Sequence, residues 1–226
     1  MRLENIMKRV AIVLSAGLLP FAAFAAPSGA GHAPDYSYVQ GDYIPTGNLH
    51  GTGNDYNGFG LEGSAAITPN VFLNGRYDRL DVDNSDTDVN RGRLGVGANG
   101  FYDYGGADGT GIGYYGTVSY ERLELRDIGG SADATGTGYG IDAGLRWMVD
   151  PAVEINPSVG WADYGSISGD GVDLGDAEGF RYGVRTLGHL SDSVAVSAEY
   201  RRTNYDLGGP DLDFDNEVRV GARYTF

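Results

Sequence analysis

Apolar and polar residues alternate along most of the chain from residue 35 onward. Ten segments show this alternation, each bounded by residues typical of turns, and a period of two is typical of a β-strand with two different faces. The expected strands cover residues 35–44, 57–67, 71–80, 91–101, 112–125, 137–149, 152–164, 179–190, 193–205 and 216–226. The pattern therefore predicts an all-β, antiparallel fold of about ten strands, with eight as the alternative.

One face of each expected strand is nearly free of charge, and the other is polar or glycine. The segment 193–205 puts Val194, Val196 and Tyr200 on one face and Glu199 and Arg201 on the other. A soluble sandwich or a lipocalin-like barrel buries its apolar face, whereas a membrane barrel turns that face to lipid. Alternation alone leaves both possibilities open.

The lengths of the connections favour the membrane barrel. Long connections are expected at 45–56, 81–90, 126–136, 165–178 and 206–215. The intervening ones include the tight turns Thr68-Pro69-Asn70, Asp150-Pro151 and Ser191-Asp192, with a longer one at 102–111. Short periplasmic turns alternating with long external loops are typical of bacterial outer-membrane barrels. We therefore predict a transmembrane up-and-down β-barrel whose first and last strands pair, because lipid leaves no backbone group unpaired.

Two further features bear on this barrel. Aromatic residues fall toward both ends of the expected strands, as at the two interfaces of a membrane: Tyr102, Tyr104, Tyr114, Trp147, Tyr224 and Phe226 at the periplasmic end, and Tyr43, Tyr77, Tyr139, Trp161, Tyr182 and Tyr200 at the outer end. Pro157 does not fit its strand, because proline donates no ladder hydrogen bond, and it is expected to mark a bulge or a strand boundary.

The first 25 residues have the features of a secretory signal. Met7-Lys8-Arg9 precedes an apolar run, and the small-residue frame Ala23-Phe24-Ala25 provides a cleavage site. We expect export through the Sec pathway and cleavage after Ala25. The predicted organisation is a signal peptide at 1–25, a short periplasmic segment at 26–34 and the barrel at 35–226, with Met1 and Met7 both possible starts.

Composition excludes several classes of function. The formal net charge of −15 argues against a partner bound through phosphates, so no nucleic-acid ligand is expected. The chain has no cysteine, which excludes disulfide frameworks, thiolate zinc sites and cysteine nucleophiles. No cofactor motif occurs in a suitable context, and we expect no cofactor.

Fourteen charged residues on the polar faces are expected to form an ion-pair network in the barrel lumen, because unpaired buried charges are costly. Arginine suits such a network, since its planar fork binds carboxylates in a bidentate manner. A narrow or gated pore lined by the same residues is the alternative. The residues are Glu62, Arg76, Asp78, Arg93, Glu121, Asp142, Arg146, Glu154, Arg181, Arg185, Glu199, Arg201, Arg219 and Arg223.

Acidic residues gather in three of the expected external loops. Their oxygen atoms could bind Ca²⁺ or Mg²⁺, and Asp81, Asp83, Asp86 and Asp88 are weak candidates, but this run lacks the glycine and glutamate of an EF-hand. Solvated loops are the preferred interpretation, and no metal site is expected. The other acidic residues are Asp170, Asp173, Asp176 and Glu178 in the fourth loop, and Asp206, Asp211, Asp213, Asp215 and Glu217 in the fifth.

Catalysis is not expected. A barrel protease needs a His–Asp pair and an Asp pair at the outer rim, and His50 is the only histidine expected near that rim. A barrel phospholipase needs Ser and His on the lipid-facing surface, whereas the alternation places His189 on the face of its strand that points into the lumen. No residue is therefore assigned a catalytic role.

The last strand, Val218-x-Val220-x-Ala222-x-Tyr224-x-Phe226, ends in an aromatic residue. Together with the signal and the opening strand Tyr36 to Tyr43, it resembles the small OmpA/OmpX/OmpW-like outer-membrane barrels, and more closely the short barrels of plant-associated and soil bacteria, some described as quorum or immune-elicitor factors. The resemblance implies that Tyr224 and Phe226 form an assembly signal read by the barrel-assembly machinery.

The resemblance also implies contact with periplasmic chaperones during biogenesis, and then with outer-membrane lipid and lipopolysaccharide. The expected function is a structural or surface-interaction role in the cell envelope, with a small passive porin as the alternative. The sequence names no external partner.

Overall fold

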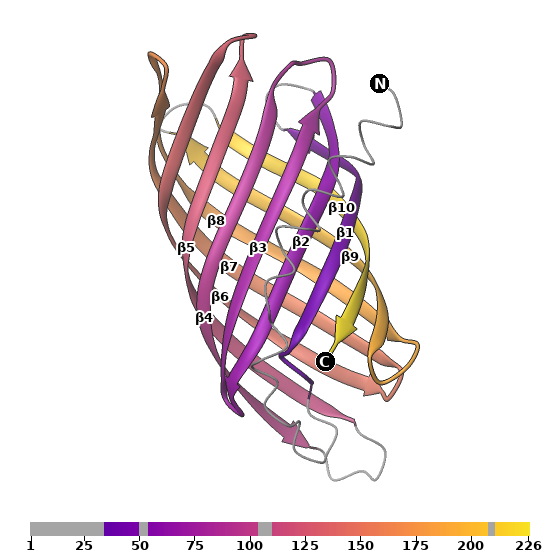
Figure 1. Cartoon of the computed structure of the whole chain (residues 1–226). Coiled ribbons are helices and arrows are strands. Elements are labelled where there is room, and N and C mark those ends of the chain that lie inside the picture. The colour runs from indigo at the N-terminus through magenta and orange to yellow at the C-terminus, as the bar shows by residue number, and fades with distance from the viewer. Residues whose placement is uncertain (1–33, 50–53, 104–109, 208–210) are drawn as a thin grey trace.

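A computed structural model describes residues 34–49, 54–103, 110–207 and 211–226 of the chain. In these residues the chain forms ten antiparallel strands, and the sheet closes on itself because β1 pairs with both β2 and β10 (Figure 1). The strands are β1 (Tyr38–Leu49), β2 (Asn54–Thr68), β3 (Val71–Val82), β4 (Asp88–Asp103), β5 (Gly111–Ile128), β6 (Ala132–Asp150), β7 (Val153–Gly169), β8 (Val172–His189), β9 (Val194–Leu207) and β10 (Asp211–Thr225). The predicted ten-stranded, up-and-down barrel is confirmed. Within the described ranges, no helix is long and apolar enough to cross a membrane.

The closing seam joins the two ends of the barrel sequence. Tyr38 of β1 lies opposite Thr225 of β10, and Tyr43 lies opposite Val220. Beyond the last strand residue, the backbone N–H of Phe226 donates to the carbonyl oxygen of Ser37 at 3.1 Å. The C-terminal residue is therefore held against the start of β1.

The strands are longer than the sequence pattern predicts, and most of the expected long loops are wrong. β5 ends at Ile128 and β6 begins at Ala132, while β7 ends at Gly169 and β8 begins at Val172. Gly129 and Gly130 in the first hairpin, and Asp170 and Gly171 in the second, have positive φ, as tight turns require. The barrel wall thus continues through segments 126–136 and 165–178, which had been expected to be loops.

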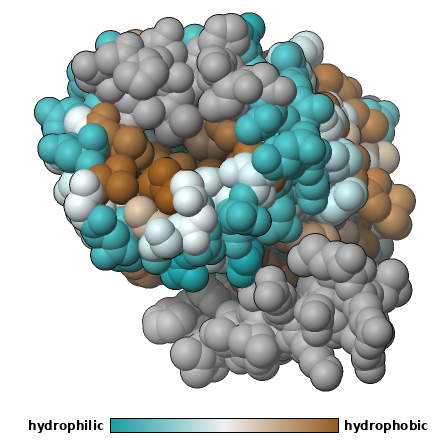
Figure 2. All heavy atoms as spheres, turned by 90° about the horizontal axis from the view of Figure 1, so that it is seen from above, coloured by the Kyte–Doolittle hydropathy of each residue, from teal (hydrophilic) through white to brown (hydrophobic). Residues whose placement is uncertain are grey.

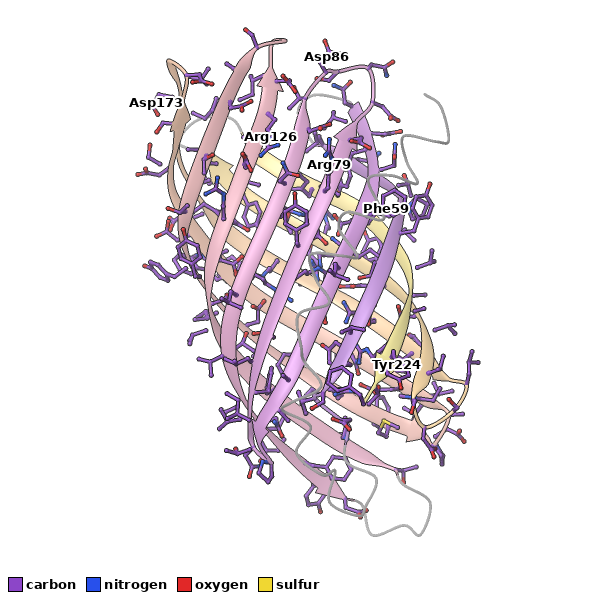
Figure 3. The ribbon with its side chains drawn as sticks, viewed as in Figure 1. Phe59, Arg79, Asp86, Arg126, Asp173 and Tyr224 are labelled. Carbon is purple, nitrogen blue, oxygen red and sulfur yellow. The ribbon has the colours of Figure 1, made fainter. Side chains whose placement is uncertain are left out.

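The barrel reverses its polarity toward the end that carries Asp86 and Asp173, which we call the upper end (Figure 3). There the apolar side chains point inward: Leu80, Leu123 and Ile167 are fully buried. The upper apolar cluster comprises Ile44, Leu49, Tyr56, Leu80, Val82, Val89, Leu123, Leu125, Ala134, Ala162, Tyr164, Ile167, Ala177, Tyr205 and Phe214. Seen from above, hydrophobic residues lie inside a ring of hydrophilic ones (Figure 2). This inversion explains why the predicted strands are too short. The apolar residues that define each expected strand lie on its outward face lower down and on its inward face at the upper end.

Below the upper apolar cluster, the apolar face points outward. Leu94 is 66% exposed and Val118 57%, although both are strongly hydrophobic. Exposed aromatic residues also lie on this outer surface, where Tyr43 packs against Phe59 with ring centroids 5.2 Å apart. An outward apolar band around a polar interior is the arrangement of a barrel surrounded by lipid.

Pro157 introduces neither a bulge nor a strand boundary, contrary to expectation. It lies within β7 and pairs with Val184 of β8. On the β6 side the pairing stops at Ser158 and resumes at Ile155 in the same register. The missing donor of proline therefore interrupts one ladder locally without displacing the strand.

Candidate functional site: the ionic lumen

The lumen below the upper apolar cluster is filled by charged side chains. All fourteen charged residues predicted to face inward are buried or mostly buried. The structure adds Asp42, Arg91 and Glu217 to them. The described part of the lumen therefore contains nine arginines and eight carboxylates in the ionic network. Glu217 had been assigned to an external loop, and the structure instead buries it completely in β10.

The uppermost ion pairs lie directly beneath the upper apolar cluster. Arg219 donates from Nη1 and Nη2 to the two carboxylate oxygens of Asp78, both at 2.8 Å, and from Nε to Glu217 at 2.6 Å. Arg91 joins the same two carboxylates, and Tyr56 donates its hydroxyl to Glu217 at 2.9 Å. Glu217 thus links the ionic network to the side chains of the cluster above.

The middle of the lumen is organised around Glu62. Its Oε2 accepts hydrogen bonds from Arg76 at 2.9 Å and Arg185 at 3.0 Å, and its Oε1 accepts one from the hydroxyl of Tyr38 at 2.6 Å. Arg185 also donates to Glu199 at 2.8 Å. These contacts connect strands on opposite sides of the barrel, so the network crosses the lumen.

Arg181 lies between two other carboxylates. It donates to both oxygens of Asp142 at 2.7 Å and to Oε1 of Glu121 at 2.7 Å. Inward glycines make room for these groups: a Cβ at Gly160 would lie 2.2 Å from Oδ1 of Asp142, and one at Gly140 would lie 2.6 Å from Oε1 of Glu121. Part of the high glycine content therefore provides space for the ion pairs.

The lower end of the lumen contains a bidentate pair and an aromatic group. Arg146 donates to Glu154 at 2.5 and 3.0 Å, and Nε2 of His189 lies 3.3 Å from the same carboxylate. The guanidinium of Arg146 also lies 4.9 Å from the ring centroid of Tyr36, which stacks on Phe72. Residues just before β1 therefore enter the lumen from below.

Two cavities remain within this network. The larger, of about 90 Å³, lies beside Tyr38, Arg93, Arg201 and Arg223, and the smaller, of about 20 Å³, lies beneath Tyr164 and Tyr205. A cavity needs roughly 10–15 Å³ to hold one water molecule. The larger one can therefore hold several waters or a small hydrated solute.

The acidic run at the β3–β4 connection is held by arginine. Arg79 binds Asp88 and lies 3.8 Å from Asp81, whereas Asp83 accepts a hydrogen bond from Asn57 at 3.3 Å. Asp86 lies at the tip of this connection (Figure 3). No group of three His, Asp or Glu residues suited to a metal ion occurs in the described ranges, and this run is not assembled into one.

The remaining candidates are distributed as follows. Asp170 accepts the backbone N–H of Asp133 at 3.1 Å, which fixes the β7–β8 hairpin against β6. His50 lies outside the described residues, as does the expected signal peptide. Tyr224 and Phe226 lie side by side with ring centroids 6.5 Å apart, and Tyr224 is exposed.

Comparison with known proteins agrees with this geometry. The family profile described as "Outer membrane protein beta-barrel domain" matches residues 16–175, more than half of the chain. The chain belongs to this family. It is therefore an outer-membrane β-barrel protein, and no curated protein matches its sequence.

Several solved barrels match the chain at low identity and low TM-score. Neisserial surface protein A (NspA) is 18% identical, with 85% of this chain and 98% of that one covered and a TM-score of 0.39. The translocator domain of the autotransporter NalP from Neisseria meningitidis is 14% identical, with 97% and 98% covered and a TM-score of 0.39. The N-terminal barrel of Pseudomonas aeruginosa OprF is 10% identical, with 84% and 98% covered and a TM-score of 0.34.

Sequence reasoning missed three lumenal charges and the whole upper apolar cluster. Arg91 lies two residues before Arg93, so its parity could have placed it in the lumen. Glu217 likewise shares the parity of Arg219 and Arg223, and the irregularity between Phe214 and Glu217 lies before it, so the alternation within β10 could have placed it in the lumen.

Proposed function

We propose that this outer-membrane barrel has a structural or surface-interaction role in the cell envelope and does not conduct solutes. The observation that carries the proposal is the complete burial of Arg219, whose guanidinium is held inside the lumen by Asp78 and Glu217. Small barrels tend to be filled by side chains, and here a charged layer and an apolar layer both occupy the interior.

A small passive porin is the second candidate. The two cavities and the arginine-rich wall around them favour it, because charged linings are what selective pores use. For conduction, solutes would have to pass both the Arg219 layer and the upper apolar cluster. Each passage would break buried ion pairs or insert ions among apolar side chains, and both are costly.

The proposal includes export and assembly. The mature protein would begin at Ala26 after Sec-dependent export, and periplasmic chaperones and the barrel-assembly machinery would insert it among outer-membrane lipid and lipopolysaccharide. The upper end would face outward, because its hairpins present acidic residues such as Asp86 and Asp173 to solvent (Figure 3). We assign no catalytic residue and no external partner.

Single-channel conductance of the refolded, full barrel in planar bilayers tests the central claim. The expected result is no current above that of the bare bilayer. Steady, ion-selective openings would instead establish the porin. Heat-modifiable gel mobility of the same sample shows that the barrel is folded. The absence of current then cannot be explained by unfolded protein.

The two parts of the proposed role can be separated in cells. Loss of the protein should increase sensitivity to detergent if the role is structural, and a chain carrying Asp86→Asn and Asp173→Asn should restore resistance. If the variant restores resistance but not attachment to a surface or to other cells, the acidic hairpins serve a surface interaction. Unchanged resistance and attachment in the deletion strain would contradict both roles.

A further inference from the structure

The wall of the larger lumenal cavity contains more cationic than anionic side chains. Its arginines are Arg93, Arg146, Arg181, Arg185, Arg201 and Arg223, and its carboxylates are Glu62, Asp142 and Glu199. Two of the arginines have further carboxylate partners outside the wall, since Arg146 binds Glu154 and Arg181 binds Glu121. When these two pairs are set aside, four arginines face three carboxylates in the wall. Each of the three carboxylates already accepts hydrogen bonds from arginine.

Three of these arginines use few of their donors. A guanidinium has five N–H groups. Within the described ranges, Arg201 makes one hydrogen bond, to Glu199 at 2.9 Å, and Arg93 makes one long contact, to Asp142 at 3.5 Å. Arg223 donates to the neutral side-chain oxygen of Gln40 at 2.9 Å, and within the described chain it forms no salt bridge. The guanidinium of Arg223 also lies over the ring of Tyr38, 3.8 Å from its centroid, and the three groups together keep N–H donors that no described residue accepts.

Three arginine donors are buried without a hydrogen-bond partner among the described residues, namely Nη2 of Arg76, Nε of Arg91 and Nε of Arg93. The Nε of Arg93 is inaccessible to solvent and has no hydrogen-bond partner among the described residues. An unpaired polar atom in the interior is costly, and a charged one more so. Arg93 and Arg201 line both cavities.

We propose that the lumen binds a small inorganic anion, of the size of chloride, between Arg93 and Arg201, with Arg223 on the lower side of the same cavity. The bound anion accepts the N–H groups of these arginines that face the cavity and offsets the excess of arginine over carboxylate. Water alone would accept hydrogen bonds from the donors but would not reduce the repulsion between the guanidinium groups. An anion does both and therefore fits the site better. The site is independent of the envelope role proposed above.

Equilibrium urea unfolding in neutral lipid vesicles tests the site, with sodium chloride replaced by sodium gluconate at constant ionic strength. Gluconate is a much larger anion than chloride, and the exchange keeps the screening of surface charges constant. Because a ligand that binds only the folded state stabilises it by mass action, the unfolding constant should fall about tenfold for each tenfold rise in chloride above the dissociation constant. No difference between the two salts would overturn the proposal.

Two variants locate the effect. Arg201→Gln should abolish the chloride dependence, whereas Arg202→Gln should retain it, because Arg202 is the next residue along β9, is 39% exposed and binds Asp215 outside the lumen. A chloride dependence that survives Arg201→Gln would place the anion elsewhere and contradict the site. Should Arg201→Gln not fold, anomalous scattering from bromide in crystals of the unaltered protein serves instead, and bromide density away from Arg93 and Arg201 would refute the proposal.

Discussion

Arg219 and Asp78 meet inside the barrel although 141 residues separate them in the chain, and two parallel hydrogen bonds of 2.8 Å join them. Arg219 belongs to β10 and Asp78 to β3, so the pair spans the closing seam between β1 and β10. This contact therefore links the first strands of the barrel to its last strand across the seam.

Asp78→Asn should lower the free energy of unfolding by about 3–5 kcal/mol, because it leaves Arg219, Arg76 and Arg91 without their shared carboxylate. Urea unfolding in vesicles measures the change. Arg126→Gln is the control, since Arg126 pairs with Glu124 on the exposed surface, and it should change stability by at most about 1 kcal/mol. Equal effects of the two substitutions would show that the central network contributes no special stability.

Arg146→Ala should destabilise the barrel by about 3–5 kcal/mol without creating a conductance. The substitution removes both hydrogen bonds of the fully buried carboxylate of Glu154 to arginine and leaves it, among the described residues, with the 3.3 Å contact to Nε2 of His189. Unfolding and single-channel recording on the same variant check both parts. Unchanged stability together with altered ion selectivity would favour the porin.

Leu123→Ala should cost about 2–5 kcal/mol, because Leu123 is fully buried in the upper apolar cluster and its loss leaves a cavity. Leu94→Ala removes the same atoms from the outer surface, where Leu94 is 66% exposed, and leaves no internal cavity. It should therefore cost less. A larger loss for Leu94→Ala, measured by urea unfolding, would contradict the structural importance of the cluster.

Gly160→Ala should destabilise by about 1–3 kcal/mol, because the added Cβ would lie 2.2 Å from Oδ1 of Asp142 and push it away from Arg181. Gly92→Ala is the matched control, since nothing lies within 4 Å of a Cβ added there. Comparable melting temperatures for both variants would mean that the ion pair shifts at no cost.

Deletion of Phe226 should reduce the amount of protein assembled in the outer membrane. The residue closes the seam through its hydrogen bond to Ser37 and ends the strand that is expected to carry the assembly signal. Phe226→Tyr keeps both the backbone contact and the aromatic ring and should assemble normally. Immunoblots of outer-membrane fractions, with heated and unheated samples, measure assembly, and normal levels of the truncated chain would oppose a role in assembly.

The sequence alone determined the fold class and most of the charged residues of the lumen. A period of two needs no knowledge of neighbouring strands, because successive side chains point to opposite faces whatever the pairing. For this reason residues such as Glu62 and Arg185 could be placed on one inner surface from their parity. The outward apolar face was equally readable, since it extends over most of each expected strand.

Only the tertiary structure decided which charges pair and where the strands end. The partners of Arg219 depend on register, and a slip of one residue changes every neighbour across a ladder. The irregularity between Phe214 and Glu217 in β10 lets both side chains point inward although their positions differ in parity. Above the lipid-facing band, the outside of the barrel is polar and the inside is apolar. Leu80 and Leu123 therefore face inward at alternate positions that carry charged residues lower in the same strands. That reversal depends on what surrounds the strand at each height, and the one-dimensional pattern does not contain this information.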